Sequence, residues 1–244
     1  MPVKELILSD ITRMAGGFCV IGLAEERGAF RSVRPMPPSG HAWPATFAHK
    51  RGDRLEFSLT PVETVRPHVE DFQSTGVLAV KDQLAEEELL DCLKRAEVAS
   101  RVNDLFGCTV KPGRTGASVH APKGRRSICG VEARRIRLKW EAGQLRAHVA
   151  LAGGEILPDL PVVDRSWYRF IETVIDGMEG ANRGQRLNRP LEERLQSIPG
   201  FFVRLGLTRP HPPRWGRCQV MLDTLFPLPR PSWVKELLAA VNPV

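Results

Sequence analysis

Residues 135–140 read Arg-Ile-Arg-Leu-Lys-Trp, an alternation of basic and apolar side chains with a period of two. Successive side chains of a β-strand point to opposite faces, so this stretch predicts a half-buried strand. The apolar set predicted to face inward is Ile136, Leu138 and Trp140. Arg135, Arg137 and Lys139 then share the outer face, which gives the strand one basic side.

The segments on either side extend this strand into a hairpin. Residues 144–151 follow the turn Glu141-Ala142-Gly143 and repeat the alternation, so we expect them to pair with it. Arg146 then lies on the paired strand and widens the basic face. Upstream, Val131 and Ala133 have the opposite phase, which predicts a β-bulge or a strand break near Arg134.

The rest of the chain is predicted to be mostly β with helical additions (α+β). Further short strands are expected at 5–9, 18–23, 29–33, 54–59, 77–80, 201–207 and 217–222. Helices are expected from Asp82 to Phe106, from Asp164 to Met178, over 191–197, and from Ser232 to Val241, with 182–188 as a loop. Small Greek-key barrels of the OB type have this pattern. We therefore predict a first barrel over 1–81, a bridging helix over 82–107, and a second barrel with a helical insertion and C-terminal helix over 108–244.

Positive charge is concentrated in the second half of the chain. The net charge is +7 and the isoelectric point is about 9.5. Residues 109–150 hold ten Lys and Arg against two Glu. Clustered Lys and Arg bind phosphates and release counterions, so nucleic acid is the expected partner. A solvated basic face, an acidic protein partner and an anionic lipid surface are the alternatives.

Basic and aromatic side chains in predicted loops complete the candidate site. Arg13 follows the first strand beside a Gly-Gly turn, where its guanidinium could contact a phosphate or pair with Asp10. Two tryptophans next to Pro or Gly are candidates for base stacking. The predicted nucleic-acid-binding residues are Arg13, Arg34, Trp43, Arg125, Arg126, Arg135, Arg137, Lys139, Arg146 and Trp215. Neutralising Arg135, Arg137 and Lys139 together is expected to weaken binding and lower its salt dependence.

Several motifs near the N-terminus resemble one family. Leu8-Ser9-Asp10-Ile11-Thr12-Arg13-Met14, Cys19-Val20-Ile21-Gly22, Arg31-Ser32-Val33-Arg34-Pro35 and Arg66-Pro67-His68-Val69-Glu70-Asp71 resemble the prokaryotic dual OB-containing domain family. The resemblance covers about the first 75 residues of the chain. It implies two OB-like barrels and a nucleic-acid-binding role, in the setting of mobile elements and defence systems, and it brings no catalytic residues.

Catalytic and metal-binding patterns are weak in this sequence. His68, Glu70 and Asp71 form the strongest set, for which a metal-assisted hydrolase is one interpretation and a structural hydrogen-bond cluster another. The five cysteines lack metal-ligand spacing and are interpreted as reduced thiols. We expect no cofactor and no metal.

The sequence as a whole favours a non-enzymatic, cytoplasmic module that binds RNA or single-stranded DNA. No stretch reaches the roughly 20 apolar residues of a membrane-spanning helix, and the first ten residues do not resemble a signal peptide. A protein-interaction scaffold, with a protein partner in a multi-component system, is the first alternative, and the hydrolase is the second.

Overall fold

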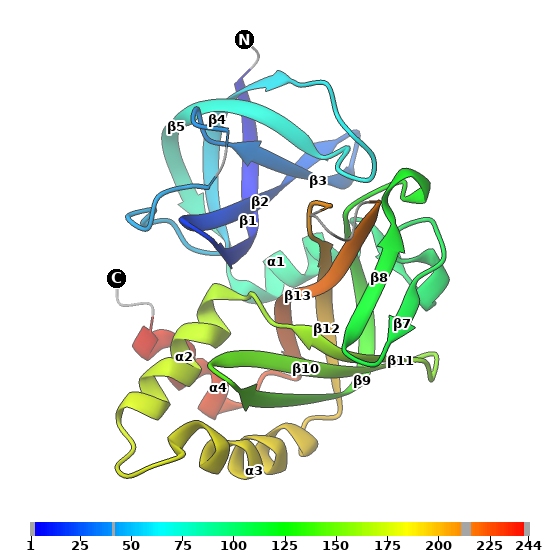
Figure 1. Ribbon diagram of the computed structural model, residues 1–244. Coiled ribbons are helices and arrows are strands. Elements are labelled where there is room, and N and C mark those ends of the chain that lie inside the picture. The colour runs from blue at the N-terminus through cyan, green and yellow to red at the C-terminus, as the bar shows by residue number, and fades with distance from the viewer. Residues whose placement is uncertain (1–2, 41, 211–215, 242–244) are drawn as a thin grey trace.

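The computed structural model describes residues 3–40, 42–210 and 216–241. Two β-barrels lie against each other, with the N-terminal barrel above the C-terminal one in Figure 1 and helices toward the lower left. This confirms the predicted fold of two OB-like barrels with helical additions. Each helix in the described residues is too short or too polar to cross a membrane.

The first barrel is closed by five strands in the order β1-β2-β3-β5-β4. Its strands are β1 (Val3–Met14), β2 (Gly17–Glu26), β3 (Ala29–Met36), β4 (Asp53–Pro61) and β5 (Asp71–Gln83). The β3–β5 pair is parallel and the others are antiparallel. The alternation predicted for β4 holds, because Leu55, Phe57 and Leu59 are buried inside the barrel while their neighbours are not. The barrel is therefore filled by one face of each strand.

The second barrel is an eight-stranded sheet that curls on itself. Seven strands follow the order β11-β10-β9-β12-β13-β8-β7, and β6 pairs with β9. They are β6 (Val98–Ala99), β7 (Lys111–Gly113), β8 (Gly116–His120), β9 (Ile128–Glu141), β10 (Gln144–Leu151), β11 (Ile156–Pro161), β12 (Gly200–Leu207) and β13 (Arg217–Leu228). Because β11 packs beside β8, the barrel is nearly closed.

The predicted hairpin is the β9–β10 pair. Its register shifts at Arg134, where Ala150 pairs with Arg135 and Leu151 pairs with Ala133. The predicted bulge is therefore confirmed. Ile136 and Leu138 are buried, and Trp140 packs against the same core.

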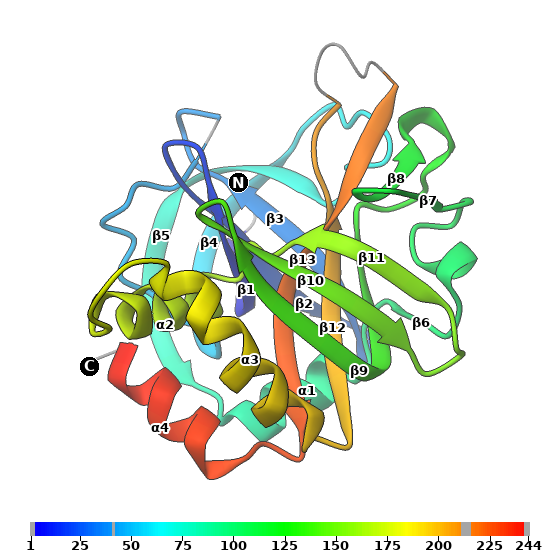
Figure 2. The ribbon, with the colours of Figure 1, turned by 60° about the horizontal axis from the view of Figure 1, so that its bottom comes forward.

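Four α-helices accompany the barrels. They are α1 (Glu86–Lys94), α2 (Arg165–Asp176), α3 (Arg183–Gln196) and α4 (Ser232–Val241). Asp164 caps α2 as predicted, since its Oδ1 accepts hydrogen bonds from the backbone N–H groups of Ser166 and Trp167. Figure 2 shows α3 crossing β9, and α4 lies beside α2.

Two helix predictions were wrong in extent. The helix predicted over 82–106 is only Glu86–Lys94, because β5 runs on to Gln83, where it pairs with Asp53. The chain then leaves the helix and pairs Val98–Ala99 with β9. The loop predicted over 182–188 is part of α3, whose Leu187, Leu191 and Leu195 form a buried stripe at a spacing of four residues.

The short helix α1 does lie at the junction of the barrels. Its Leu89 and Leu93 are buried in a cluster with Ile7 of the first barrel and Phe202 and Phe226 of the second. A bridging element at this place was predicted. The shared apolar cluster means that the two barrels pack directly on each other.

Candidate functional site between the barrels

A pocket of about 820 Å³ lies between the two barrels. Volumes of about 300–1,000 Å³ are usual for small-ligand sites. The first barrel contributes strands β1–β3 and the loop before β5, and the second contributes β12, β13 and the residues after β12. The described lining residues are Thr12, Arg13, Met14, Ala15, Cys19, Ile21, Arg34, Met36, Gly40, His68, Leu207, Thr208, Arg209, Arg217, Gln219, Met221 and Asp223. Neither barrel forms the pocket alone.

The charged side chains that line the described part of the pocket are mainly arginines. Arg13, Arg34, Arg209 and Arg217 line it together with a single carboxyl group, that of Asp223. Most of the remaining wall is apolar. An apolar cavity with a few fixed polar groups and an excess of guanidinium groups suits an organic anion.

Arg34 is the centre of a buried hydrogen-bond network in this wall. Its Nη1 donates to Asp71 Oδ1 at 2.7 Å and lies 3.2 Å from His68 Nδ1, while its Nη2 donates to Ser127 Oγ at 3.0 Å. Glu70 accepts hydrogen bonds from both the backbone N–H and the hydroxyl of Ser127 at 2.8 Å. Since Ser127 belongs to the second barrel, this network fixes the two barrels relative to each other.

Arg209 adds a second guanidinium to the same carboxylate. Its Nη2 donates to Asp71 Oδ2, and its side chain remains 54% exposed. The carboxylate of Asp71 therefore pairs with two arginines, one buried and one exposed. Burial raises the pKa of Glu70, although Arg34 and Ser127 oppose the rise.

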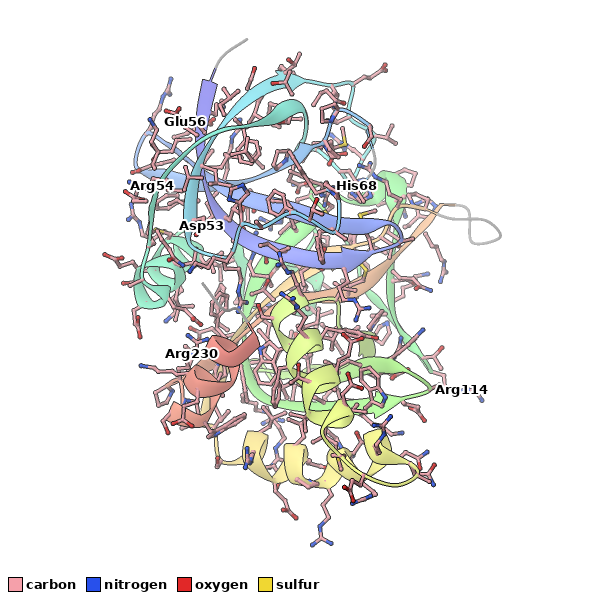
Figure 3. The ribbon with its side chains drawn as sticks, turned by 90° about the vertical axis from the view of Figure 1, so that its left-hand side faces the viewer. Asp53, Arg54, Glu56, His68, Arg114 and Arg230 are labelled. Atoms are coloured by element: carbon pink, nitrogen blue, oxygen red, sulfur yellow. The ribbon has the colours of Figure 1, made fainter. Side chains whose placement is uncertain are left out.

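His68 is a neutral hydrogen-bond donor in this arrangement. Burial, with the charges of Arg34 and Arg209, lowers the pKa of His68 to about 3. Because Arg34 donates toward Nδ1, the ring proton belongs on Nε2. A backbone group of Thr208 opposes the pKa shift, but Nε2 makes no hydrogen bond of normal geometry within the described residues. Figure 3 shows where His68 lies in the first barrel.

Asp223 comes from a β-bulge in the second barrel. Arg204 pairs with Thr224 and Leu205 pairs with Leu222, so Asp223 is the extra residue of β13. It is 3% exposed, and its Oδ1 has no hydrogen-bond partner among the described residues. Burial raises the pKa of Asp223 well above 3.8, and the nearby Asp10 adds to the rise.

Gly206 makes the space for this carboxyl group. A Cβ atom at Gly206 would lie 2.0 Å from Asp223 Oδ2. Sequence analysis missed Asp223 because the last strand was predicted to end at Leu222. An acidic residue within the run Val220-Met221-Leu222-Asp223-Thr224-Leu225 was the feature that could have revealed it.

The structure places the predicted N-terminal candidates in or beside the pocket, but with partners. Arg13 lines the pocket, yet its Nη1 donates to Glu172 at 2.9 Å and its guanidinium lies 3.8 Å from the centre of the Tyr168 ring. Arg34 is buried and held by Asp71, so it supports the wall rather than an exposed surface.

The stacking roles predicted for the two tryptophans have different outcomes. The expectation that Trp43 is available for stacking was wrong, because its ring is 7% exposed and packs on Phe47 and Phe57 inside the first barrel. Its indole N–H donates to the Pro35 carbonyl at 2.7 Å. Trp215 lies outside the described residues.

The predicted basic strand face exists, but acidic residues accompany it. Arg135 and Arg137 are exposed and Lys139 is half-buried on the outer side of β9. Arg137 pairs with Glu192 of α3, and Lys139 pairs with Glu141. Arg135 has no ion-pair partner in the part of the chain that the structure describes.

Of the other predicted basic residues, some are held by partners within the protein and one is exposed. Arg146 is held by Asp159 through two nitrogens at 2.8 and 3.1 Å. Arg126 donates to the carbonyls of Asp104 and Leu105, so it stabilises a turn. Arg125 is exposed.

The proposed hydrolase set does not form a metal site. His68 and Asp71 meet through Arg34, but Glu70 points to Ser127 instead. The described residues contain no group of three or more His, Cys, Asp or Glu that could hold a metal ion. The arrangement is that of a structural network at the rim of a binding pocket.

Comparison with known proteins adds no relative. No model of a known protein family matches the chain, and no curated protein is similar to it in sequence. The functional interpretation therefore rests on the pocket and on the charges around it.

Proposed function

We propose that the protein binds single-stranded RNA or DNA, with the strand held in the cleft between the two barrels. The observation that carries this proposal is the pocket itself, whose described lining includes four arginines and one buried carboxyl group. A phosphate backbone is the polyanion for which such a set of guanidinium groups is suited. Barrels of the OB type commonly use a sheet face and the flanking loops for this purpose.

Arg209 and Arg217 are the residues that we place on the phosphates. Both side chains are exposed at the pocket, unlike Arg34. Arg209 shares Asp71 with Arg34, and Arg217 has no ion-pair partner among the described residues. These two arginines therefore offer charge and hydrogen-bond donors that the protein itself does not use fully.

Positive charge continues from the pocket onto the second barrel. Arg217 pairs in register with His120 at the end of β8, which runs toward the first barrel in Figure 1. Lys123 and Arg125 are exposed in the loop that follows. Arg114, at the other end of β8, lies at the periphery in Figure 3. A strand that leaves the pocket in this direction meets further phosphate-binding groups.

Two features support the cellular setting that we propose, namely the family resemblance and the state of the cysteines. The resemblance to the dual OB-containing domain family supports a role in a prokaryotic mobile-element or defence system. All five cysteines are unpaired thiols, which suits the reducing cytoplasm. We propose a binding role without catalysis.

Binding to a short RNA, a single-stranded DNA and a duplex at two salt concentrations tests the proposal. Single strands should bind best, and with about three phosphate contacts the affinity should fall about 20-fold between about 50 and about 200 mM salt. Indifference to all three nucleic acids at low salt would contradict the proposal and favour the protein-interaction scaffold.

A further inference from the structure

We propose that the pocket between the barrels seats one nucleotide, with its base on the apolar wall, the base edge at Asp223 and His68, and the phosphate at Arg209 and Arg217. The proposal rests on the nucleic-acid function above and names the unit that the site recognises.

The apolar wall suits a flat heteroaromatic ring. Three of the five methionines in the chain, Met14, Met36 and Met221, line this one pocket. Thioether groups make favourable contacts with aromatic rings and adapt to their outline. Ile21 and Leu207 extend the same wall. Because the described lining residues include no Phe, Tyr or Trp, the stacking partners of the base are methionine and arginine.

The edge of a base carries both hydrogen-bond donors and acceptors, and the pocket offers both. Asp223 is buried with a free Oδ1, which no residue of the described chain satisfies. A buried polar atom without a partner costs free energy, on the order of 1–3 kcal/mol, unless a ligand satisfies it. His68 of the opposite barrel contributes a buried Nε2–H donor, which has no hydrogen bond of normal geometry among the described residues although a backbone group of Thr208 interacts with the ring. A lipid tail would not use this combination, and the comparison with ribose 5-phosphate below separates a base from a sugar.

The position of Asp223 is built into the fold rather than incidental. Asp223 is the extra residue of the bulge in β13, so its side chain departs from the regular alternation of inward and outward side chains along the strand. Gly206 on β12 lacks a side chain and so leaves room for the carboxyl group. The carboxyl group faces the charges of Arg34 and Arg204, which favour its ionised form, and of Asp10 and Asp164, which oppose it. Burial is the largest influence on this carboxyl group and raises its pKa, so a partner that donates a hydrogen bond to it would be favoured.

The phosphate lies at the exposed edge of the pocket in this arrangement. Arg209 and Arg217 are exposed, whereas Asp223 and His68 are buried. A ligand with an apolar flat end and an anionic end, which is the chemistry of a nucleotide, fits this order of groups from inside to outside. The nucleotide can be part of a strand or free in solution.

Calorimetric titration with the four ribonucleoside 5′-monophosphates and with ribose 5-phosphate tests the proposal. At least one nucleotide should bind about tenfold more tightly than ribose 5-phosphate, which lacks the base. Asp223→Asn and His68→Gln should each reduce or reorder this preference and leave the affinity for ribose 5-phosphate unchanged. Met221→Ala, which changes only the apolar wall, should reduce the affinity for every base. Thermal unfolding checks that each variant is folded.

The outcomes separate this proposal from the function on which it rests. If a single strand binds with the expected salt dependence but no nucleotide exceeds ribose 5-phosphate, the base site is wrong and the strand-binding function stands. If a mononucleotide binds with the stated preference but an oligonucleotide gains nothing over it, the pocket is a site for a free nucleotide and the strand-binding function fails. A base preference that Asp223→Asn, His68→Gln and Met221→Ala all leave intact would overturn the assignment of the pocket.

Discussion

Asp10 of the first barrel and Arg204 of the second form an ion pair at 3.2 Å, and neither side chain is exposed to solvent. Ser9 Oγ donates to Asp10 Oδ2 at 2.6 Å, and Arg204 Nη2 donates to Ser32 Oγ at 2.9 Å. The carboxylate of Glu97 completes the network by accepting from the Ser32 hydroxyl. The barrels therefore share one buried polar network.

Breaking this pair should destabilise the whole protein. Asp10→Ala leaves a buried guanidinium without its main partner, and we expect it to lower the free energy of unfolding by about 3–5 kcal/mol. Denaturant unfolding followed by fluorescence and by far-ultraviolet circular dichroism measures the loss. The double variant Asp10→Leu/Arg204→Met should lose clearly less. If the double variant lost as much as the sum of the single variants Asp10→Leu and Arg204→Met, the pair would not be coupled.

Acid should destabilise the protein through His68. The pKa of His68 is about 3 in the folded protein and 6.5 in the unfolded chain, so the folded state binds fewer protons. The contribution of the neutral His68 ring to the free energy of unfolding is therefore fully present above pH 6.5. It is lost as the pH falls toward about 3, by up to about 1.4 kcal/mol per pH unit. The stability difference between the natural protein and His68→Gln should shrink over this range. A difference independent of pH would contradict the assignment of a neutral, buried His68.

A side chain at Gly206 should disturb the base site specifically. Gly206→Ala places a Cβ atom against the Asp223 carboxyl group, which must move. We expect nucleotide affinity to fall about tenfold, the effect of one lost hydrogen bond, while the salt dependence of strand binding stays the same. Titration of the variant with mononucleotides and with a single strand measures both. Unchanged nucleotide affinity would show that Asp223 does not contact the base.

The basic face of β9, formed by Arg135, Arg137 and Lys139, provides a competing surface. Because Glu192 and Glu141 pair with two of these side chains, we expect only about one free phosphate contact there. Changing all three to Gln should lower the salt slope for a single strand by about 0.7. A fall of two or more would place the main nucleic-acid contact on β9 and not in the cleft.

Local patterns predicted much of the fold. The alternation over 135–140, the bulge near Arg134 and the Asp164 cap follow from interactions within a few residues, and each is present in the structure. The extent of α1 could not be predicted in this way. Pairing of Gln83 with Asp53, and of Val98 with Gly130, depends on distant strands that override the helical periodicity.

The candidate site was harder to predict, because distant segments build it. Asp10 and Arg204 are separated by 194 residues, and Arg34 and Ser127 by 93. Sequence composition identified the arginines but not their partners, so the pairing of Arg34 with Asp71 in the pocket wall was not predicted. Asp223 depends on a bulge whose position is set by its pairing with β12.

The most direct test of strand binding in the cleft compares two double variants. Arg209→Gln/Arg217→Gln removes two positive charges at the pocket, and Lys94→Gln/Arg189→Gln removes two exposed charges from helices α1 and α3. For a single strand, the first variant should lower the slope of log affinity against log salt by about 1.4, and the second should leave the slope unchanged. Equal effects of the two variants would contradict binding in the cleft and leave only diffuse attraction by the positive net charge.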